Sequence, residues 1–283
     1  MSSKFTAEDV KTLRERTGVG MGKCKEALEQ AGGDMEKAID ILRKAGMASA
    51  VKKEGRETRE GVIGADEGKS AIAVLEVNAE TDFVTKNEKF VEFVKDVCHD
   101  AAESKPASLD LFINQKSKKD PNVTIDQYRA LVMQSLGENI RFKRLAIIPK
   151  SPDLSIGIYS HMGGKIVCIV EISGGAGQEA LARDIAMHVA AESPDYLRPE
   201  EIPQDIIARE SEIAREQVKG KPANIVDKIV EGKLKAFYDQ VCLLSQKYVK
   251  DNAVTIAQLL ENESKRLGKK LTLKKFIRWK VGE

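Results

Sequence analysis

Two glycine-rich segments of the sequence have the composition of phosphate-binding loops. The first, Gly64–Ser70, reads GADEGKS and places three residues between its glycines, whereas a P-loop places four there. A P-loop also opens a helix, but the apolar run Ala71–Leu75 that follows this segment has the length of a strand. We therefore interpret the segment as a turn and not as a nucleotide site.

The second segment, Gly175–Ala180, matches the spacing G-x-G-x-x-[GA] and lies between an expected strand and an expected helix. The chain beyond it is rich in proline, at Pro194, Pro199 and Pro203, and does not continue into a second parallel strand. A flexible loop is the favoured interpretation, and a nucleotide-using enzyme built on this segment is the alternative. Direct binding of a nucleotide to the chain would distinguish the two.

The histidines and cysteines are not spaced as a metal or catalytic site. The three histidines are separated by 62 and 27 residues, with no carboxylate partner at ligand spacing. The four cysteines lie about 70 residues apart, form no CxxC pair and are typical of free thiols in a reducing cytosol. There is also no G-x-S-x-G motif. We expect no catalytic residue, no metal and no cofactor.

Composition limits the partner and the location. The 283 residues give room for about two domains. The 46 Lys and Arg residues against 44 Asp and Glu residues argue against nucleic acid as the main partner, although they leave a local patch open. No apolar run is long enough to span a membrane, and the N-terminal sequence MSSKFTAEDV has no signal-peptide core. We expect a cytoplasmic protein that contacts neither membrane nor nucleic acid directly.

The first 46 residues have the pattern of three short helices. Thr6 with Asp9 is a capping box for the first helix, and Gly18-Val19-Gly20 ends it. A second amphipathic run follows, and Asp34 caps a third helix that we expect to end at Gly46. Residues 47–60 are polar and lack an apolar stripe, so we interpret them as a linker between this module and the rest of the chain.

An internal repeat organises the rest of the sequence. Ala101–Ser104 and Ala190–Ser193 both read AAES, at an offset of 89, and His99 falls on His188 at the same offset. Before each of these words the sequence predicts two strands joined by a turn, with glycines at Gly64/Gly68 in one copy and Gly163/Gly164 in the other, and then a helix. The predicted fold class is α+β, with two related subdomains that each have a small antiparallel sheet and helices on one face.

Further elements complete these subdomains, which we place at residues 61–140 and 141–283. Residues 141–149 and 276–282 are predicted to add one strand to each sheet. Two apolar stripes in residues 204–245 flank a turn at Gly220-Lys221-Pro222 and predict a projecting antiparallel helical hairpin.

The loop after the first long strand reads NAETDFV, from Asn78 to Val84. Either Thr81 or Asp82 is suited to N-cap the helix that begins there. Phe83 then falls in the first turn, where it is either a core residue or an exposed aromatic anchor of the kind that dominates protein interfaces. The sequence pattern leaves both interpretations of Phe83 open.

Several motifs together resemble the family of bacterial translation elongation factor Ts. The N-terminal motifs are LRERTGVGM, from Leu13 to Met21, and CKEAL, from Cys24 to Leu28. EVNAETDFV, MHVAA and IVEG follow at Glu76, Met187 and Ile229. The similarity extends from about residue 5 to the end of the chain, with a motif in every segment.

The resemblance implies a guanine-nucleotide exchange factor that binds elongation factor Tu and has no cofactor of its own. It implies a UBA-like N-terminal domain that contacts the partner's G domain through Arg14 and Met21. It also implies a wedge at Asp82 and Phe83, flanked by Thr81 and Val84, that disturbs the partner's Mg²⁺ and phosphate site. The helix of His188 would face the third domain of the partner, and the hairpin would be the family's coiled coil.

Two departures from the family pattern affect these expectations. Relatives often have two methionines where this chain has Met21 and Gly22, which would weaken one N-terminal contact. The chain stops at Glu283, so the contact that a further C-terminal helix makes in some relatives is expected to be absent. Whether the chain forms a homodimer or a 2:2 complex stays open. A UBA-type binder of ubiquitin-like or nascent chains is a second alternative, although it leaves the repeat unexplained.

Overall fold

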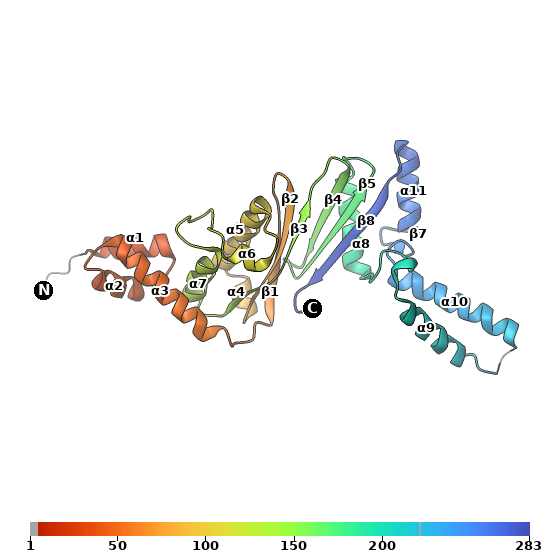
Figure 1. Ribbon diagram of the computed structural model, residues 1–283, viewed down its shortest axis with the longest axis horizontal. Coiled ribbons are helices and arrows are strands. Elements are labelled where there is room, and N and C mark those ends of the chain that lie inside the picture. The colour runs from red at the N-terminus through yellow and green to blue at the C-terminus, as the bar shows by residue number, and fades with distance from the viewer. Residues whose placement is uncertain (1–4, 221) are drawn as a thin grey trace. The chain divides into compact units, whose positions relative to one another are not determined.

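The computed structural model describes residues 5–220 and 222–283 and divides into two compact units (Figure 1). The first unit contains the chain up to Lys150 together with the short segments Gly163–Lys165 and Lys280–Glu283. The second unit contains Ser151–Met162 and Ile166–Trp279. The described residues form eleven α-helices and eight strands, so the fold class is mixed, with small antiparallel sheets, as the sequence predicts.

Three helices begin the first unit: α1 (Ala7–Thr17), α2 (Met21–Gln30) and α3 (Met35–Lys53). The capping box at Thr6 is confirmed, because its backbone N–H donates to Asp9 Oδ2 at 2.7 Å and its hydroxyl accepts from the N–H of Asp9. Asp34 caps α3 as expected, by accepting from the N–H of Lys37. These helices share their own apolar cluster around Leu13 and Leu28.

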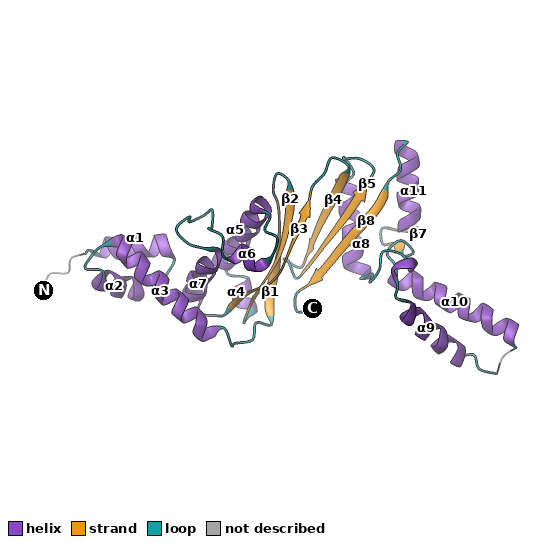
Figure 2. Ribbon diagram, viewed as in Figure 1, coloured by secondary structure: helices purple, strands orange, loops and turns teal. Residues whose placement is uncertain are grey.

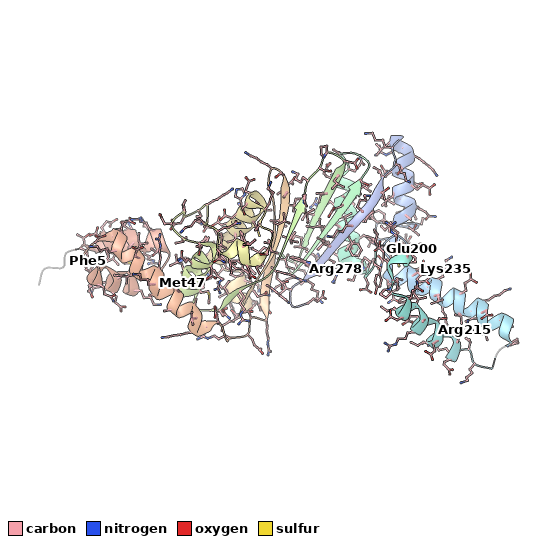
Figure 3. All side chains as sticks on the ribbon, viewed as in Figure 1. Phe5, Met47, Glu200, Arg215, Lys235 and Arg278 are labelled. Atoms are coloured by element: carbon pink, nitrogen blue, oxygen red, sulfur yellow. The ribbon has the colours of Figure 1, made fainter. Side chains whose placement is uncertain are left out.

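The expected end of the third helix at Gly46 is wrong, because α3 continues to Lys53 and half of the expected linker 47–60 is helical. Gly46 is instead a point of close contact with α7 (Ile125–Leu136), where an added Cβ would lie 3.3 Å from Gln134 Oε1. Met47, labelled in Figure 3, and Ala50 belong to the core beyond it. The inward-facing residues Gly46 and Ala50 are small and do not form an obvious apolar stripe in the sequence. This explains why the sequence pattern placed the end of the helix too early.

The sheet of the first unit has the strand order β1-β2-β3, from β1 (Glu60–Glu67), β2 (Ala71–Ala79) and β3 (Ile140–Pro149). Both pairs are antiparallel, which confirms the strand expected at 141–149. Helix α5 (Glu88–Ser104) packs against β1 and β2 (Figure 2), and the short helix α6 (Leu109–Ile113) and α7 contact β3. Phe90, Phe93 and Phe112 are fully buried in this core.

Gly64 lies inside β1 and not in the turn where the sequence placed it. A Cβ at this position would lie 2.5 Å from Cys98 Sγ and 2.7 Å from a methyl carbon of Val94, both on α5. The second unit has the same device at Gly157, whose Cβ would lie 2.0 Å from the backbone nitrogen of Arg183. The glycines therefore let each helix approach its sheet closely.

The second unit repeats the pattern with β4 (Leu154–His161), β5 (Ile166–Ser173) and β8 (Thr272–Lys280), in the order β4-β5-β8, and with α8 (Glu179–Glu192) packed against β4 and β5. β4 and β5 are antiparallel. The last strand begins four residues before the expected 276–282. The residue that ends the helix is left-handed in both copies, Lys105 with φ 51° and Ser193 with φ 47°. Helix α8 ends one residue earlier relative to the word AAES, because Pro194 has no N–H for the capping bond.

The remaining chain of the second unit contains a helix pair and a short two-stranded sheet. Helix α9 (Gln204–Glu216) packs along α10 (Ala223–Val241), and Arg215 (Figure 3) pairs with Asp227 at 3.3 Å. Lys221 of the expected turn lies outside the described residues. A 3₁₀ turn at Pro199–Glu201 precedes the pair, and β6 (Lys247–Tyr248), β7 (Asp251–Thr255) and α11 (Ile256–Leu267) follow it.

Candidate functional site

Phe83 is an exposed aromatic side chain on a short helix at the end of β2. Helix α4 (Asp82–Thr85) has only four residues, and 84% of Phe83 is exposed, whereas Val84 and Thr85 are buried beneath it. The core interpretation of Phe83 is therefore wrong. Phe83 therefore projects its ring into solvent, which is the exposure expected of an aromatic anchor.

Thr81 is the N-cap of α4. Its backbone is extended, with φ −128° and ψ 158°, and its hydroxyl oxygen accepts from the N–H of Val84 at 3.4 Å. This confirms one of the two capping residues that the sequence allowed. The other, Asp82, is the first helical residue.

Glu138 holds Thr81 from the turn between α7 and β3. One carboxylate oxygen accepts from the Thr81 backbone N–H at 3.0 Å, and the other accepts from the Thr81 hydroxyl at 2.6 Å. A reciprocal bond runs the other way, since the N–H of Asn139 donates to Glu80 Oε1 at 2.6 Å. The sequence analysis missed Glu138, whose one local signal is its place after the helix-ending Gly137.

Charged side chains alternate in sign beside Phe83. The ammonium of Lys86 donates to the Asp82 carboxylate at 2.7 Å, and this bond and charge hold the pKa of Asp82 below its ordinary value. The same bond raises the pKa of Lys86. Lys165, itself paired with Glu60, adds a smaller lowering effect on the pKa of Asp82. Because the pair of Asp82 and Lys86 is solvent-exposed, it is free to exchange partners at little cost.

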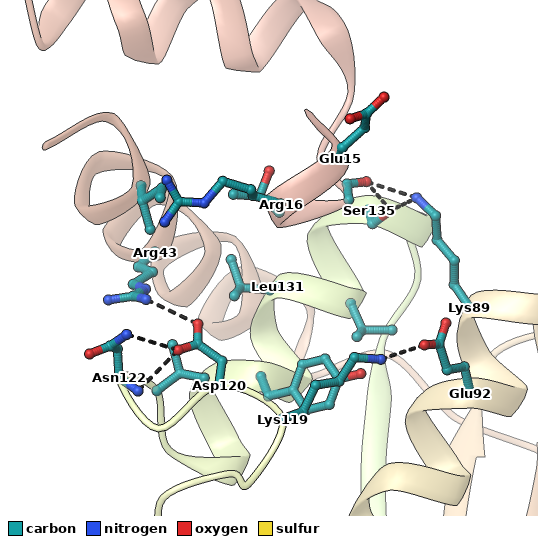
Figure 4. A pocket seen from close by; sticks show the side chains of 16 residues that line it. Glu15, Arg16, Arg43, Lys89, Glu92, Lys119, Asp120, Asn122, Leu131 and Ser135 are labelled. Carbon is teal, nitrogen blue, oxygen red and sulfur yellow. Dashed lines mark hydrogen bonds and ion pairs between the residues drawn. The ribbon is translucent and has the colours of Figure 1, made fainter. Parts of the chain in front are cut away.

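Arg14 and Met21 lie where α1 ends and α2 begins. Both are exposed, Met21 by 43%, and Val19 between them is fully buried. The turn is fixed on the neighbouring helices through the carbonyl oxygen of Gly18. That oxygen accepts from Lys89 Nζ at 2.8 Å and from the hydroxyl of Ser135 at 2.7 Å (Figure 4).

A cleft of about 520 Å³ lies beside this turn, between the N-terminal helices, α5 and α7 (Figure 4). On its far side Arg43 donates to Asp120 at 3.1 Å. Lys119 donates to Glu92 and Asp96. The charged side chains that line the cleft thus bond to each other. This favours a structural role for the cleft, in which these bonds hold the helices together. Among the described residues, no group of three or more His, Cys, Asp or Glu is arranged to hold a metal ion.

His188 is fully buried in the second unit. Its Nε2 lies 3.0 Å from Gln246 Oε1, and its Nδ1 accepts from the N–H of Val249 at 3.2 Å. Burial lowers its pKa, which favours the neutral ring with the proton on Nε2. His99, at the matching position of the repeat, is instead exposed and bonds Asp66 at 2.8 Å. The ring of His188 therefore offers no exposed surface for direct contact with another protein.

Comparison with known proteins places these features in a family. A sequence profile described as elongation factor TS matches residues 80–283, more than half of the chain. Elongation factor Ts of Protochlamydia amoebophila (strain UWE25) is 61% identical over 274 residues, which cover 97% of each chain. Elongation factor Ts of Chlamydia muridarum and of Chlamydia felis are 45% and 46% identical over 280 residues, with 99% of each chain covered.

The chain belongs to the elongation factor Ts family. This places it among translation elongation factors that act in nucleotide exchange by binding and not as enzymes. The profile includes α4 and Glu138, whereas Arg14 and Met21 lie before it. The elongation factor Ts relatives also align with nearly all of the N-terminal helices, because the alignments cover 97% to 99% of the chain. None of the described helices has the length and apolar character needed to cross a membrane.

Proposed function

We propose that the chain binds elongation factor Tu, in its nucleotide-free or GDP-bound form, and promotes the release of GDP. Phe83 acts as a wedge that inserts between helices of the partner's G domain and disturbs its Mg²⁺ and phosphate site. Asp82, Thr81 and Val84 shape the wedge. The proposal supports a role in cytoplasmic translation elongation and needs no cofactor bound to this chain.

The observation that carries the proposal is the 84% exposure of Phe83 on a helix that is braced from below. Burying a phenylalanine side chain is worth about 1.5–3 kcal/mol. If the contact forms only when the nucleotide has left, that free energy couples the two binding events and weakens GDP binding by roughly ten- to a hundredfold. Release is then faster without any bond being made or broken.

The N-terminal helices supply a second contact in this proposal. We assign helices α1, α2 and α3 to a UBA-like module that touches the partner through Arg14 and Met21. Two related subdomains follow, one on the sheet β1-β2-β3 and one on the sheet β4-β5-β8. Arg14 and Met21 are both exposed, and the bonds of Gly18 hold their turn against α5, which begins just after α4. The α9–α10 pair is the family's coiled coil, and a homodimer or 2:2 complex is compatible with the proposal. His188 acts by supporting its helix.

The test is the release of a fluorescent GDP analogue from elongation factor Tu, followed by stopped flow. The parent chain should accelerate release, and Phe83→Ala should lose roughly ten- to a hundredfold of the maximal rate. Leu111→Ala is the matched control. Leu111 is also a large exposed apolar residue of the first unit, with 58% of it exposed, but it lies on α6 and not on α4. The control should behave as the parent.

Two results would contradict the proposal. If the folded parent does not accelerate release, exchange activity is excluded and a UBA-type binder becomes the better interpretation. If Phe83→Ala and Leu111→Ala both accelerate release as the parent does, the activity stands but the wedge is not Phe83. Calorimetry of GDP with this chain alone should show no binding, in contrast to a nucleotide-using enzyme.

A further inference from the structure

Helix α4 is too short to hold its own orientation. A helix of four residues has scarcely more than one hydrogen-bonded turn, and isolated helices of this length are not stable in water. The direction of Phe83 must therefore come from contacts of α4 with the rest of the unit. Val84 and Thr85 fix the buried side of α4, but they do not fix its N-terminal end, where Asp82 and Phe83 lie.

The N-terminal end of α4 is fixed by Glu138, through the N-cap residue Thr81. Within residues 5–220 and 222–283, Glu138 is the one side chain outside 81–86 that hydrogen-bonds to that segment. Its two carboxylate oxygens bind the two donors of Thr81, the backbone N–H at 3.0 Å and the hydroxyl at 2.6 Å. Hydrogen bonds to an ionised acceptor are shorter and stronger than neutral ones, so this double bond restrains Thr81 in both position and rotation.

The bond to the hydroxyl also strengthens the cap. Because the hydroxyl proton points at Glu138, the lone pairs of Thr81 Oγ1 are left to accept from the N–H of Val84. Hydrogen bonds in such a chain polarise each other. Removing the carboxylate frees the Thr81 hydroxyl to rotate. Water then competes with the Val84 N–H for the hydroxyl oxygen, and the cap of α4 is weakened.

The base of Glu138 is itself held in place. The next residue, Asn139, is fully buried and donates its backbone N–H to Glu80 Oε1 at 2.6 Å. The side-chain amide of Asn139 donates to the carbonyl oxygen of Arg56 at 2.8 Å, and Arg56 pairs with Glu80. The segment before α4 and the turn that carries Glu138 are therefore hydrogen-bonded to each other in both directions.

We infer that Glu138 is a positioning residue for the wedge, which it orients through Thr81 without touching the partner itself. The inference rests on the proposed exchange function. Phe83 can be buried in another protein only if its side chain keeps pointing away from this chain. Glu138 restrains that orientation from a segment outside the loop that carries Phe83.

The test compares Glu138→Gln with Glu88→Gln in the same exchange assay. The amide keeps the size of Glu138 but is neutral and accepts through one oxygen only. Both bonds to Thr81 therefore lose their charge assistance, and the second persists only if the Thr81 hydroxyl turns to accept. Glu88, the first residue of α5, is exposed, and its side chain hydrogen-bonds to none of the described residues. It therefore controls for the loss of one negative charge near α4.

Glu138→Gln should lower the maximal rate of GDP release by roughly tenfold, equivalent to about 1.4 kcal/mol. The half-saturating concentration should change little, because the N-terminal contacts remain. A merely unstable variant would instead raise the half-saturating concentration and reach the parent's plateau. Glu88→Gln should retain the parent's plateau. If Glu138→Gln also retains it, or if Glu88→Gln loses as much, the inference is overturned.

Hydrogen exchange separates this inference from the proposed function. The backbone amides of Thr81 and Val84 should exchange faster in Glu138→Gln than in the parent and in Glu88→Gln. This readout holds even if the parent fails to accelerate GDP release, in which case only the exchange function falls. Unchanged protection of both amides would overturn the positioning role whatever the exchange assay shows.

Discussion

The ammonium of Lys89 donates a 2.8 Å hydrogen bond to the carbonyl oxygen of Gly18, a residue 71 positions earlier in the chain. Ser135 Oγ bonds the same oxygen and also accepts from Lys89. Gly18 is the left-handed residue that ends α1, so its carbonyl has no partner within the helix. Two segments of the first unit thus meet at one backbone oxygen, between the two regions proposed to contact a partner.

Lys89→Met should loosen the turn between α1 and α2 without unfolding the unit. The two lost bonds, to Gly18 and to Ser135, are exposed, so the free energy of unfolding should fall by only about 0.5–1 kcal/mol. The backbone amides of Val19 and Gly20 should exchange faster with solvent. In the exchange assay the half-saturating concentration should rise a few-fold with an unchanged plateau. Lys95→Met, an exposed lysine of the same helix that bonds none of the described residues, is the control and should match the parent.

Phe83→Ala and Phe93→Ala should differ strongly in their effect on stability. Phe83 is 84% exposed, so its removal should change the free energy of unfolding by less than about 0.5 kcal/mol. Phe93 is fully buried, with its ring 4.9 Å from that of Tyr128, so its removal should cost about 3–5 kcal/mol. Urea denaturation followed by circular dichroism measures both. A large loss of stability in Phe83→Ala would show that this ring also packs internally.

His188 should make the protein less stable in mild acid. Burial holds the pKa of His188 in the folded protein below the ordinary 6.5. As the pH falls below 6.5, the His188 ring is therefore protonated in the unfolded chain before it is protonated in the folded protein. Its contribution is complete above pH 6.5 and is lost as the pH falls from 6.5 toward the folded pKa. The slope cannot exceed roughly 1.4 kcal/mol per pH unit for one proton.

Thermal unfolding between pH 7.5 and 5.5 tests this expectation. His188→Gln should be less stable than the parent at pH 7.5, because the N–H of Val249 loses its acceptor. The same variant should depend less on pH over this range. Equal pH slopes in the two proteins would show that His188 is not the group responsible.

Two glycine-to-alanine substitutions in the second unit should change stability in opposite directions. A Cβ at Gly157 would lie 2.0 Å from the backbone nitrogen of Arg183, so Gly157→Ala must push α8 away from its sheet and should cost about 3 kcal/mol or more. Gly232 lies within α10 with no atom within 4 Å of an added Cβ, so Gly232→Ala should stabilise by about 0.5–1 kcal/mol. Denaturation midpoints distinguish the two, and equal midpoints would refute the close approach at Gly157.

Local signals were sufficient wherever the chain interacts with itself over a few residues. The capping box of Thr6 and Asp9 and the cap at Asp34 are set by hydrogen bonds that span three residues, and they are found as predicted. The repeat predicted the paired strands and the helix after them. The same reasoning failed at Gly46 and Gly64, where the glycine marks close packing of a helix on a distant segment and not a helix end or a turn.

The sequence by itself determined the caps, the alternating strands and the repeat, because these depend on backbone preferences and on the periodic spacing of apolar residues. Only the tertiary structure decided that Phe83 on α4 is exposed and that His188 on the repeated helix α8 is buried. Burial depends on what covers a face, and the covering residues come from elsewhere: Gln246 and Val249 lie at His188, whereas none of the described residues covers Phe83. The link from Glu138 to Thr81 spans 57 residues and exists only after folding has closed that loop.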